Sequence, residues 1–169
     1  MHNPTIYYFC TLESQITMPN TYTQLYVHLV FAVKNRDAVI AKNWENDLYK
    51  YITGIVTNKS CKLYAIGGMY DHIHVFVSMS PNQSVSSLVA DIKRSSSLWI
   101  NENKFVVGKF SWQEGFGAFS YSKSQISQVV KYIENQENHH KKLLFVDEYR
   151  SLLSLFGIEY DEKYIFSQL

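Results

Sequence analysis

Cysteine and proline are scarce in this sequence. Its 169 residues include two cysteines and three prolines. Cys10 and Cys61 stand far apart, so they have neither the close spacing of a thiolate zinc site nor the density of a disulfide-stabilised secreted domain. We therefore expect both thiols to be reduced and the protein to be cytoplasmic.

The sequence also lacks a large excess of either positive or negative charge. The formal net charge is +1, which excludes the strongly basic signature of many nucleic-acid-binding proteins. The distribution is uneven, because residues 143–169 carry a net charge of −3 and residues 1–142 carry +4. This asymmetry permits nucleic-acid binding by the first part of the chain without predicting it.

Long apolar runs are missing, and so is a targeting signal. No stretch approaches the roughly 20 apolar residues of a membrane-spanning helix, so we expect no membrane partner. The first residues lack the basic segment and long apolar segment of a signal peptide. Residues 1–20 also lack a regular apolar pattern, and Met18 is an alternative to Met1 as the native start.

Apolar and aromatic side chains are abundant, at 46% and 15% of the residues, which predicts a well-packed globular core. Alternating or continuous apolar runs predict strands over residues 24–34, 61–69, 72–79 and 116–122. Helical spacing of apolar residues predicts helices over residues 44–56, 85–99, 122–137 and 145–157. Ser122 and Gln125 form a capping box for the third of these helices, and Gly157 is suited to end the fourth.

The order of these elements indicates the fold class. Strand, helix, strand, strand, helix and strand form the βαββαβ split unit of an α+β, ferredoxin-like domain. We expect an antiparallel sheet with helices packed on one face, followed by a C-terminal helix that carries a tyrosine and by a further terminal helix. No linker or internal repeat interrupts the pattern, so a single domain is predicted.

The stretch MYDHIHVFVSM, residues 69–79, contains two histidines two positions apart. Strand side chains alternate between faces, so His72 and His74 share one face, while Ile73 and Val75 point to the core on the other. Two interpretations are open: polar residues on the solvent face of an ordinary strand, or a pair of metal ligands. The first is favoured unless a partner residue exists elsewhere in the chain.

A partner pair occurs in the stretch KYIENQENHH, residues 131–140. Tyr132 and Gln136 are four positions apart, so they lie on the same side of a helix. They fall at the edge of its apolar stripe, from which side chains can reach the rim of the sheet. Taken alone, such a pair is more often a surface tyrosine that covers the edge of the core.

Together, the HIH strand and a YxxxQ helix about 60 residues later resemble the HUH superfamily of single-strand nucleases. The segment GFGAFSYSKSQISQVVKYIENQENHHKK resembles the tyrosine helix of the insertion-sequence-200-like enzymes called transposase A, and of their REP-associated tyrosine transposase relatives. The segment YVHLVFAVKNR resembles the first strand of that family. The resemblance runs from about residue 21 to residue 145.

This resemblance implies a DNA transposase that cuts and rejoins single-stranded DNA at hairpin-bearing element ends. It places metal ligands at His72, His74 and Gln136, the metal being Mg²⁺ or Mn²⁺. It makes Tyr132 the nucleophile, which would form a 5′-phosphotyrosine intermediate. It also implies a homodimer in which the tyrosine helix of one subunit completes the site of the other, with pairing in cis or in trans left open.

The resemblance also suggests how the chain is divided. We expect residues 1–20 to be an N-terminal extension, residues 21–145 to be the catalytic domain, and residues 146–169 to be a helical appendage of the same domain. The first and last segments fall outside the family pattern.

Several further residues are weaker candidates. Asp71 would orient a metal-binding histidine, or would simply turn the hairpin. His28 lies on the strand face opposite Leu29 and is a minor candidate to point towards the site. Candidate phosphate contacts, each with a solvated surface as the favoured alternative, are Lys34, Arg36, Lys93 and Arg94.

Two further groups of candidates carry aromatic or basic side chains. Trp112 and Phe116 are candidates to stack on bases, with core packing favoured for Phe116. The basic run 139–142 ends the tyrosine helix, where cations suit the helix dipole, and it is not expected to bind metal.

Two alternative functions remain open at this level. A ferredoxin-like module would bind nucleic acid without cleaving it, and the histidines would then be ordinary strand residues. A domesticated nuclease acting on chromosomal repeats would share every catalytic residue and differ in its substrate.

Overall fold

A computed structural model describes residues 21–37, 39–136 and 144–165 of the chain. Its strands are β1 (Tyr26–Ala32), β2 (Lys62–Met69), β3 (His72–Ser78) and β4 (Gly117–Tyr121). Its helices are α1 (Lys42–Asn58), α2 (Val85–Glu102), α3 (Ile126–Glu134), α5 (Phe145–Leu155) and α6 (Glu162–Ile165). Two short 3₁₀ turns, η1 (Lys34–Arg36) and η2 (Lys123–Gln125), follow β1 and β4.

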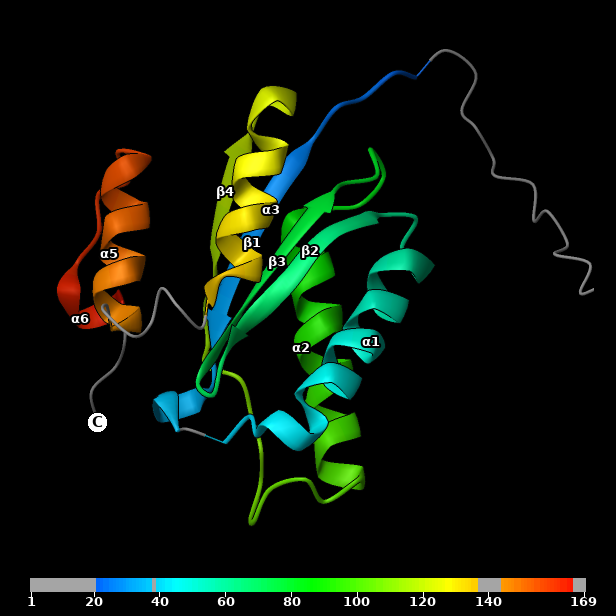
Figure 1. Cartoon of the computed structure of the whole chain (residues 1–169), viewed down its shortest axis with the longest axis vertical. Helices are drawn as coiled ribbons and strands as arrows, with labels where there is room; N and C mark the ends of the chain where they lie inside the picture. Colours follow the sequence, from blue (N-terminus) through cyan, green and yellow to red (C-terminus); the bar gives the residue numbers. More distant parts are fainter. Residues whose placement is uncertain (1–20, 38, 137–143, 166–169) are drawn as a thin grey trace, which may run out of the picture.

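The four described strands form one antiparallel sheet in the order β2-β3-β1-β4. This order arises because β2 and β3 form a hairpin through Tyr70 and Asp71, and β1 inserts between β3 and β4. The α+β, ferredoxin-like fold expected from the element order is therefore confirmed (Figure 1).

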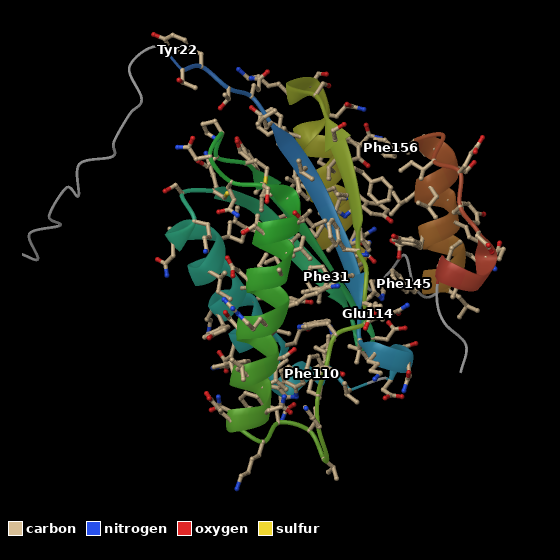
Figure 2. All side chains as sticks on the ribbon, turned by 180° about the vertical axis from the view of Figure 1, so that it is seen from behind. Tyr22, Phe31, Phe110, Glu114, Phe145 and Phe156 are labelled. Atoms are coloured by element: carbon tan, nitrogen blue, oxygen red, sulfur yellow. The ribbon has the colours of Figure 1, made fainter. Side chains whose placement is uncertain are left out.

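The first face of the sheet carries the main hydrophobic core. Leu29, Phe31 and Val75 from the two central strands pack with buried residues of α1 and α2, such as Leu48 and Ile92. The predicted alternation along β1 and β3 is correct for this face. Both helices lie on this side of the sheet, as the two opposite views show (Figures 1 and 2).

The expectation that the second face is exposed to solvent, with helices on one face alone, is wrong. His72, His74 and Phe76 on this face are each 0% exposed. Helix α3 covers the part of the face near Phe76, where it buries Val129 and Ile133. Helix α5 covers the part near Ala32, because its apolar stripe supplies a second set of core residues. Periodicity in β3 alone could not reveal these covering helices, since both follow it by more than 40 residues.

Helix α3 begins later than predicted, at Ile126, because the 3₁₀ turn η2 follows Ser122, and it also ends earlier. The capping box is present, with the Ser122 backbone N–H donating to Gln125 Oε1 at 2.9 Å. The helix was expected to run to about Glu137, but α3 ends at Glu134, because Asn135 adopts non-helical backbone angles of φ −100° and ψ 19°. Tyr132 therefore lies in the last turn of α3, and Gln136 follows its end.

Gly67 sets how closely α3 approaches the sheet. Gly67 is paired with His74 across the β2–β3 ladder. A Cβ atom at Gly67 would lie 2.6 Å from the Ile133 carbonyl oxygen, a distance that real Cβ contacts do not show. The absence of a side chain here lets the end of α3, with Tyr132, lie directly over the histidine strand.

We expect Gly67→Ala to lower the free energy of unfolding by about 1–3 kcal/mol, because α3 must move away from β2. Gly54→Ala is the matched control, since a Cβ there meets no described atom within 4 Å in the middle of α1. The control should stabilise the protein by up to about 1 kcal/mol, because alanine has the higher helix propensity. Urea denaturation of both variants tests this, and equal effects of the two substitutions would contradict it.

Candidate active site

His72 is held at the start of β3 by two contacts. Its Nδ1 lies 2.8 Å from Asp71 Oδ1, and its ring stacks on Phe145 of α5 with ring centroids 3.9 Å apart. Burial lowers the pKa of His72 to about 4, although the hydrogen bond with Asp71 acts in the opposite direction. The imidazole is therefore neutral near pH 7, and its Nε2 atom lies 3.6 Å from Glu148 Oε2 of α5.

His74 has a different partner for its Nδ1 atom. His28 of β1 is 0% exposed, and its Nε2 lies 2.9 Å from His74 Nδ1. Burial also holds the pKa of His28 well below its ordinary value. His28 therefore does point towards the histidine pair, as the minor interpretation of the sequence suggested.

Tyr132 and Gln136 reach the same place from the other side. The Tyr132 ring meets the His74 ring edge to face, with centroids 5.9 Å apart. The Tyr132 hydroxyl donates to Glu148 Oε1, and Gln136 Nε2 donates to the same oxygen at 2.9 Å. The structure thus brings His72, His74, Tyr132 and Gln136 together around a single carboxylate.

That carboxylate was not anticipated from the sequence. Glu148 lies in α5, within the segment expected to be an appendage, and is 1% exposed. Its oxygens lie 3.6 Å from His72 Nε2 and 3.6 Å from His74 Nε2. The available signal was its position, because Glu148 falls in the apolar stripe of α5 between Phe145 and Leu152. A carboxylate is rarely buried there without a partner.

The cluster has the donor set of a divalent metal site. The ligand atoms of His72, His74 and Glu148 all lie within 4.8 Å of one another. Within the described part of the chain, His74 Nε2 and Gln136 Oε1 are buried and take part in no hydrogen bond. Ligands of one ion lie roughly 3–3.5 Å apart, so separations of 3.6 Å leave room for a cation between the imidazoles and the carboxylate. The residues present therefore fit such an ion.

Helix α5 covers this site. Its Phe145, Leu152 and Leu153 pack against β1 and Phe119, and Phe145 and Phe156 lie on the side of α5 that faces the sheet (Figure 2). Burial, followed by the charge of Glu148, raises the pKa of the Tyr132 hydroxyl above its ordinary value. In this arrangement, which we call the covered site, Tyr132 is protonated and its hydroxyl is engaged with Glu148.

The four basic candidates lie in different environments. Lys34 is exposed, and the side chain of Arg36 is outside the described residues. Lys93 is half-buried, and its Nζ donates to the carbonyl oxygens of Gln113, at 2.9 Å, and Gly115. Arg94 is exposed and pairs with Asp91 at 3.1 Å. Their contacts with phosphates remain predictions.

The two aromatic candidates have the reverse of their expected environments. Trp112 is 7% exposed and donates from Nε1 to Ser96 Oγ at 2.8 Å, so it is a core residue in this structure. Phe116, for which core packing was favoured, is 38% exposed. Residues 139–142, including His139, His140, Lys141 and Lys142, lie outside the described residues.

Among the described helices, none combines the length and the apolar character that crossing a membrane requires.

Comparisons with known proteins show which family the chain resembles. Residues 21–136 match the family described as IS200-like transposases. The chain is also similar to the ISDra2 transposase TnpA of Deinococcus radiodurans, with 24% identity over 120 residues, which cover 68% of this chain and 86% of that protein. The family match ends at Gln136, so α5 and Glu148 lie beyond it.

Two solved structures share the fold. A Deinococcus radiodurans protein assigned as a transposase superposes with a TM-score of 0.55 at 22% identity, over 69% of this chain and 94% of that one. A REP-associated tyrosine transposase, solved bound to a REP hairpin, superposes with a TM-score of 0.56 at 15% identity, over 71% of each chain.

We expect Mn²⁺ to stabilise the protein against heat. A ligand that binds the folded state at 100 times its Kd contributes about 2.7 kcal/mol, which corresponds to roughly 5–10 °C in Tm for a domain of this size. The double variant His72→Ala, His74→Ala should lose this shift. Asp47→Asn, which removes an exposed carboxylate of α1, should keep it. Differential scanning calorimetry tests the prediction, and an equal shift in all three proteins would indicate binding elsewhere.

Proposed function

The chain belongs to the family of IS200-like transposases, and on this basis we propose that it cuts and rejoins single-stranded DNA at hairpin-bearing element ends through a covalent tyrosine intermediate. Membership of the family implies an enzyme that breaks and rejoins DNA. The single-stranded substrate, the hairpin and the tyrosine mechanism are the proposal.

One observation carries this proposal. The Tyr132 hydroxyl, the Nε2 atoms of His72 and His74, and the Gln136 amide all surround the Glu148 carboxylate. A nucleophile and a set of metal-binding atoms thus converge on one anionic group. Because a carboxylate and a phosphodiester both present anionic oxygen acceptors, the same groups are suited to surround a scissile phosphate.

In the proposed reaction, the Tyr132 oxygen attacks the phosphorus of a DNA phosphodiester. A bond forms between phosphorus and the tyrosine oxygen, and the bond from phosphorus to the 3′ oxygen of the preceding nucleotide breaks. The products are a 5′-phosphotyrosine and a free 3′-hydroxyl. Because the covalent bond conserves the energy of the broken one, rejoining requires no nucleotide cofactor.

His72, His74 and Gln136 are proposed to hold the divalent ion, with Mg²⁺ or Mn²⁺ suited to this mixed nitrogen and oxygen set. The ion supplies electrostatic stabilisation of the charge that develops on the phosphate. Asp71 is proposed to orient the His72 ring through its contact with Nδ1. These three ligands are neutral, so they leave the charge of the ion available to the phosphate.

Glu148 is proposed to serve as a ligand of the covered site and to leave when DNA binds. His72, His74 and Gln136 are each buried under α5, with at most 2% exposure. A phosphodiester therefore reaches them after α5 moves, and its oxygen takes the place of the carboxylate. On this proposal residues 21–145 form the catalytic domain, and the 146–169 appendage carries Glu148 into it.

Two observations support DNA as the partner: the ligand of a solved structure with the same fold, and the basic side chains of this chain. A REP-associated tyrosine transposase of the same fold was solved bound to a REP hairpin, which supports a hairpin as the substrate class here. We propose Lys34, Arg36, Lys93 and Arg94 as phosphate contacts.

A homodimer is also proposed. Whether Tyr132 serves the histidines of its own subunit or those of the partner is part of the same proposal.

A second candidate function has one observation in its favour. The relative just mentioned is associated with REP sequences, so a domesticated nuclease that acts on chromosomal repeats would use the same residues. Hairpins from the flanks of the gene and hairpins from dispersed repeats distinguish the two substrates when they are offered in competition.

Tyr132→Phe should abolish the covalent adduct, because it removes the attacking oxygen, and should leave DNA binding largely intact. The assay uses Mn²⁺ and single-stranded hairpin oligonucleotides labelled on either side of the cut, resolved on denaturing gels. Tyr121→Phe is the matched control, because Tyr121 is half-buried beside His28 and does not meet Glu148 in any described hydrogen bond. Cleavage by Tyr132→Phe without an adduct would instead establish a hydrolytic metal nuclease.

Glu148→Gln should weaken metal binding without slowing DNA cleavage. Loss of the charged ligand should weaken Mn²⁺ binding to the DNA-free protein by about 10-fold or more, because losing even a residue that only supports a ligand weakens metal binding by about 10–100-fold. Adduct formation at saturating Mn²⁺ should be at least as fast as in the wild type, since the side chain leaves before the reaction. Asp147→Asn, which alters the neighbouring half-exposed carboxylate, is the control. Loss of adduct in Glu148→Gln would show that the carboxylate stays during catalysis.

A further inference from the structure

Each of the two histidines of β3 has a buried partner for its second ring nitrogen. For His72 this partner is the Asp71 carboxylate, and for His74 it is the imidazole of His28. His28 is placed by the sheet register, since Val30 of β1 lies opposite His74 and His28 is two residues away on the same face. The two imidazoles stack at a centroid distance of 5.0 Å and an interplanar angle of 25°.

The hydrogen bond between His28 and His74 can be made in two ways. The proton lies either on His74 Nδ1, with His28 Nε2 accepting it, or on His28 Nε2, with His74 Nδ1 accepting it. An imidazole that accepts a hydrogen bond at one ring nitrogen is neutral and carries its proton on the other, so His28 would carry its proton on Nδ1 in the first arrangement and on Nε2 in the second. A neutral His74 in the second arrangement would carry its own proton on Nε2.

The two arrangements differ in what His74 offers to the site. His74 Nε2 faces the Glu148 carboxylate from 3.6 Å, and an imidazole nitrogen binds a metal through its lone pair. A proton on that nitrogen would block the ion. Metal binding therefore requires the first arrangement, in which His74 donates from Nδ1 to His28.

We propose that His28 is a positioning residue that holds His74 in the Nδ1–H tautomer, so that its Nε2 lone pair faces the metal. This inference rests on the metal site of the proposed function. His28 acts through His74, since within the described part of the chain its side chain makes its one hydrogen bond to that ring. Being a neutral acceptor, it fixes the tautomer without adding a negative charge that would offset the charge of the ion.

The packing around His28 keeps its ring in place for this role. Phe119 and Tyr121 of β4 meet it at centroid distances of 6.1 Å and 6.2 Å, and Tyr132 meets it edge to face at 6.2 Å. The ring is thus confined between the sheet and α3. A substitution that preserves volume but removes the acceptor separates hydrogen bonding from packing.

The test compares His28→Leu with His28→Gln by titrating each full-length protein with Mn²⁺ in a calorimeter, without DNA. Leucine fills the space without an acceptor, whereas the glutamine Oε1 can accept the proton of His74 Nδ1. We expect His28→Leu to raise the Kd for Mn²⁺ by about 10–100-fold and His28→Gln to remain close to the wild type. Phe76→Leu, a change at a fully buried position on the same face, controls for general loosening of the core.

A Kd in His28→Leu equal to that of the wild type would overturn the inference and leave the metal site standing. Equal weakening in the leucine and glutamine variants would also overturn it, because packing and not the acceptor would then matter. Absence of Mn²⁺ binding by the wild type would overturn the metal site and this inference with it.

A second measurement applies even if a variant fails to fold. Imidazole ¹⁵N NMR of the wild-type protein, with Zn²⁺ as a diamagnetic probe, reports directly which ring nitrogen of His74 carries the proton. Protonated Nδ1 with unprotonated His28 Nε2 is the expected result. A proton on His28 Nε2 in the loaded protein would contradict the proposal.

Discussion

The buried carboxylate of Glu148 is the group on which the second face of the sheet depends. A carboxylate removed from water costs several kcal/mol unless other groups compensate for its charge. Tyr132 and Gln136 each donate a hydrogen bond to it. The nearby imidazole nitrogens of His72 and His74, at 3.6 Å, are too distant to do the same. A cation between these groups would complete the compensation, and it would thereby couple metal binding to the positions of α5 and of Tyr132.

Two small features of the sheet make this coupling geometrically feasible. Gly67 lacks a side chain at the point where α3 crosses β2, so the tyrosine helix lies close to His74. The register of β1 against β3 pairs His28 with Phe76, two residues from His74 on the same face, so the His28 ring reaches His74 Nδ1. The histidines and Tyr132 are thus held by the sheet and α3, and on the proposed function α5 is the component that moves when a DNA strand enters.

Much of this arrangement could be predicted from the sequence, and the reasons for the exceptions are physical. The alternation in β1 and β3, the capping box of Ser122 and the order of elements are local signals, and the ferredoxin-like fold follows from them. The environments of Trp112 and Glu148 depend on contacts between distant segments, such as the Trp112 bond to Ser96 and the packing of α5 on β1. The position of Glu148 in the apolar stripe of α5 indicated burial, but local periodicity does not reveal which distant residues a side chain contacts. The polar strand face looked solvent-exposed because the covering helices come later in the chain.

The most direct test of the account is anomalous diffraction from crystals of the protein soaked in Mn²⁺. The account predicts a strong manganese peak within about 2.2 Å of both His72 Nε2 and His74 Nε2, on the side of the sheet covered by α5. Manganese found at surface carboxylates alone, with no peak between the two imidazoles, would contradict the central claim that this histidine pair is a metal site.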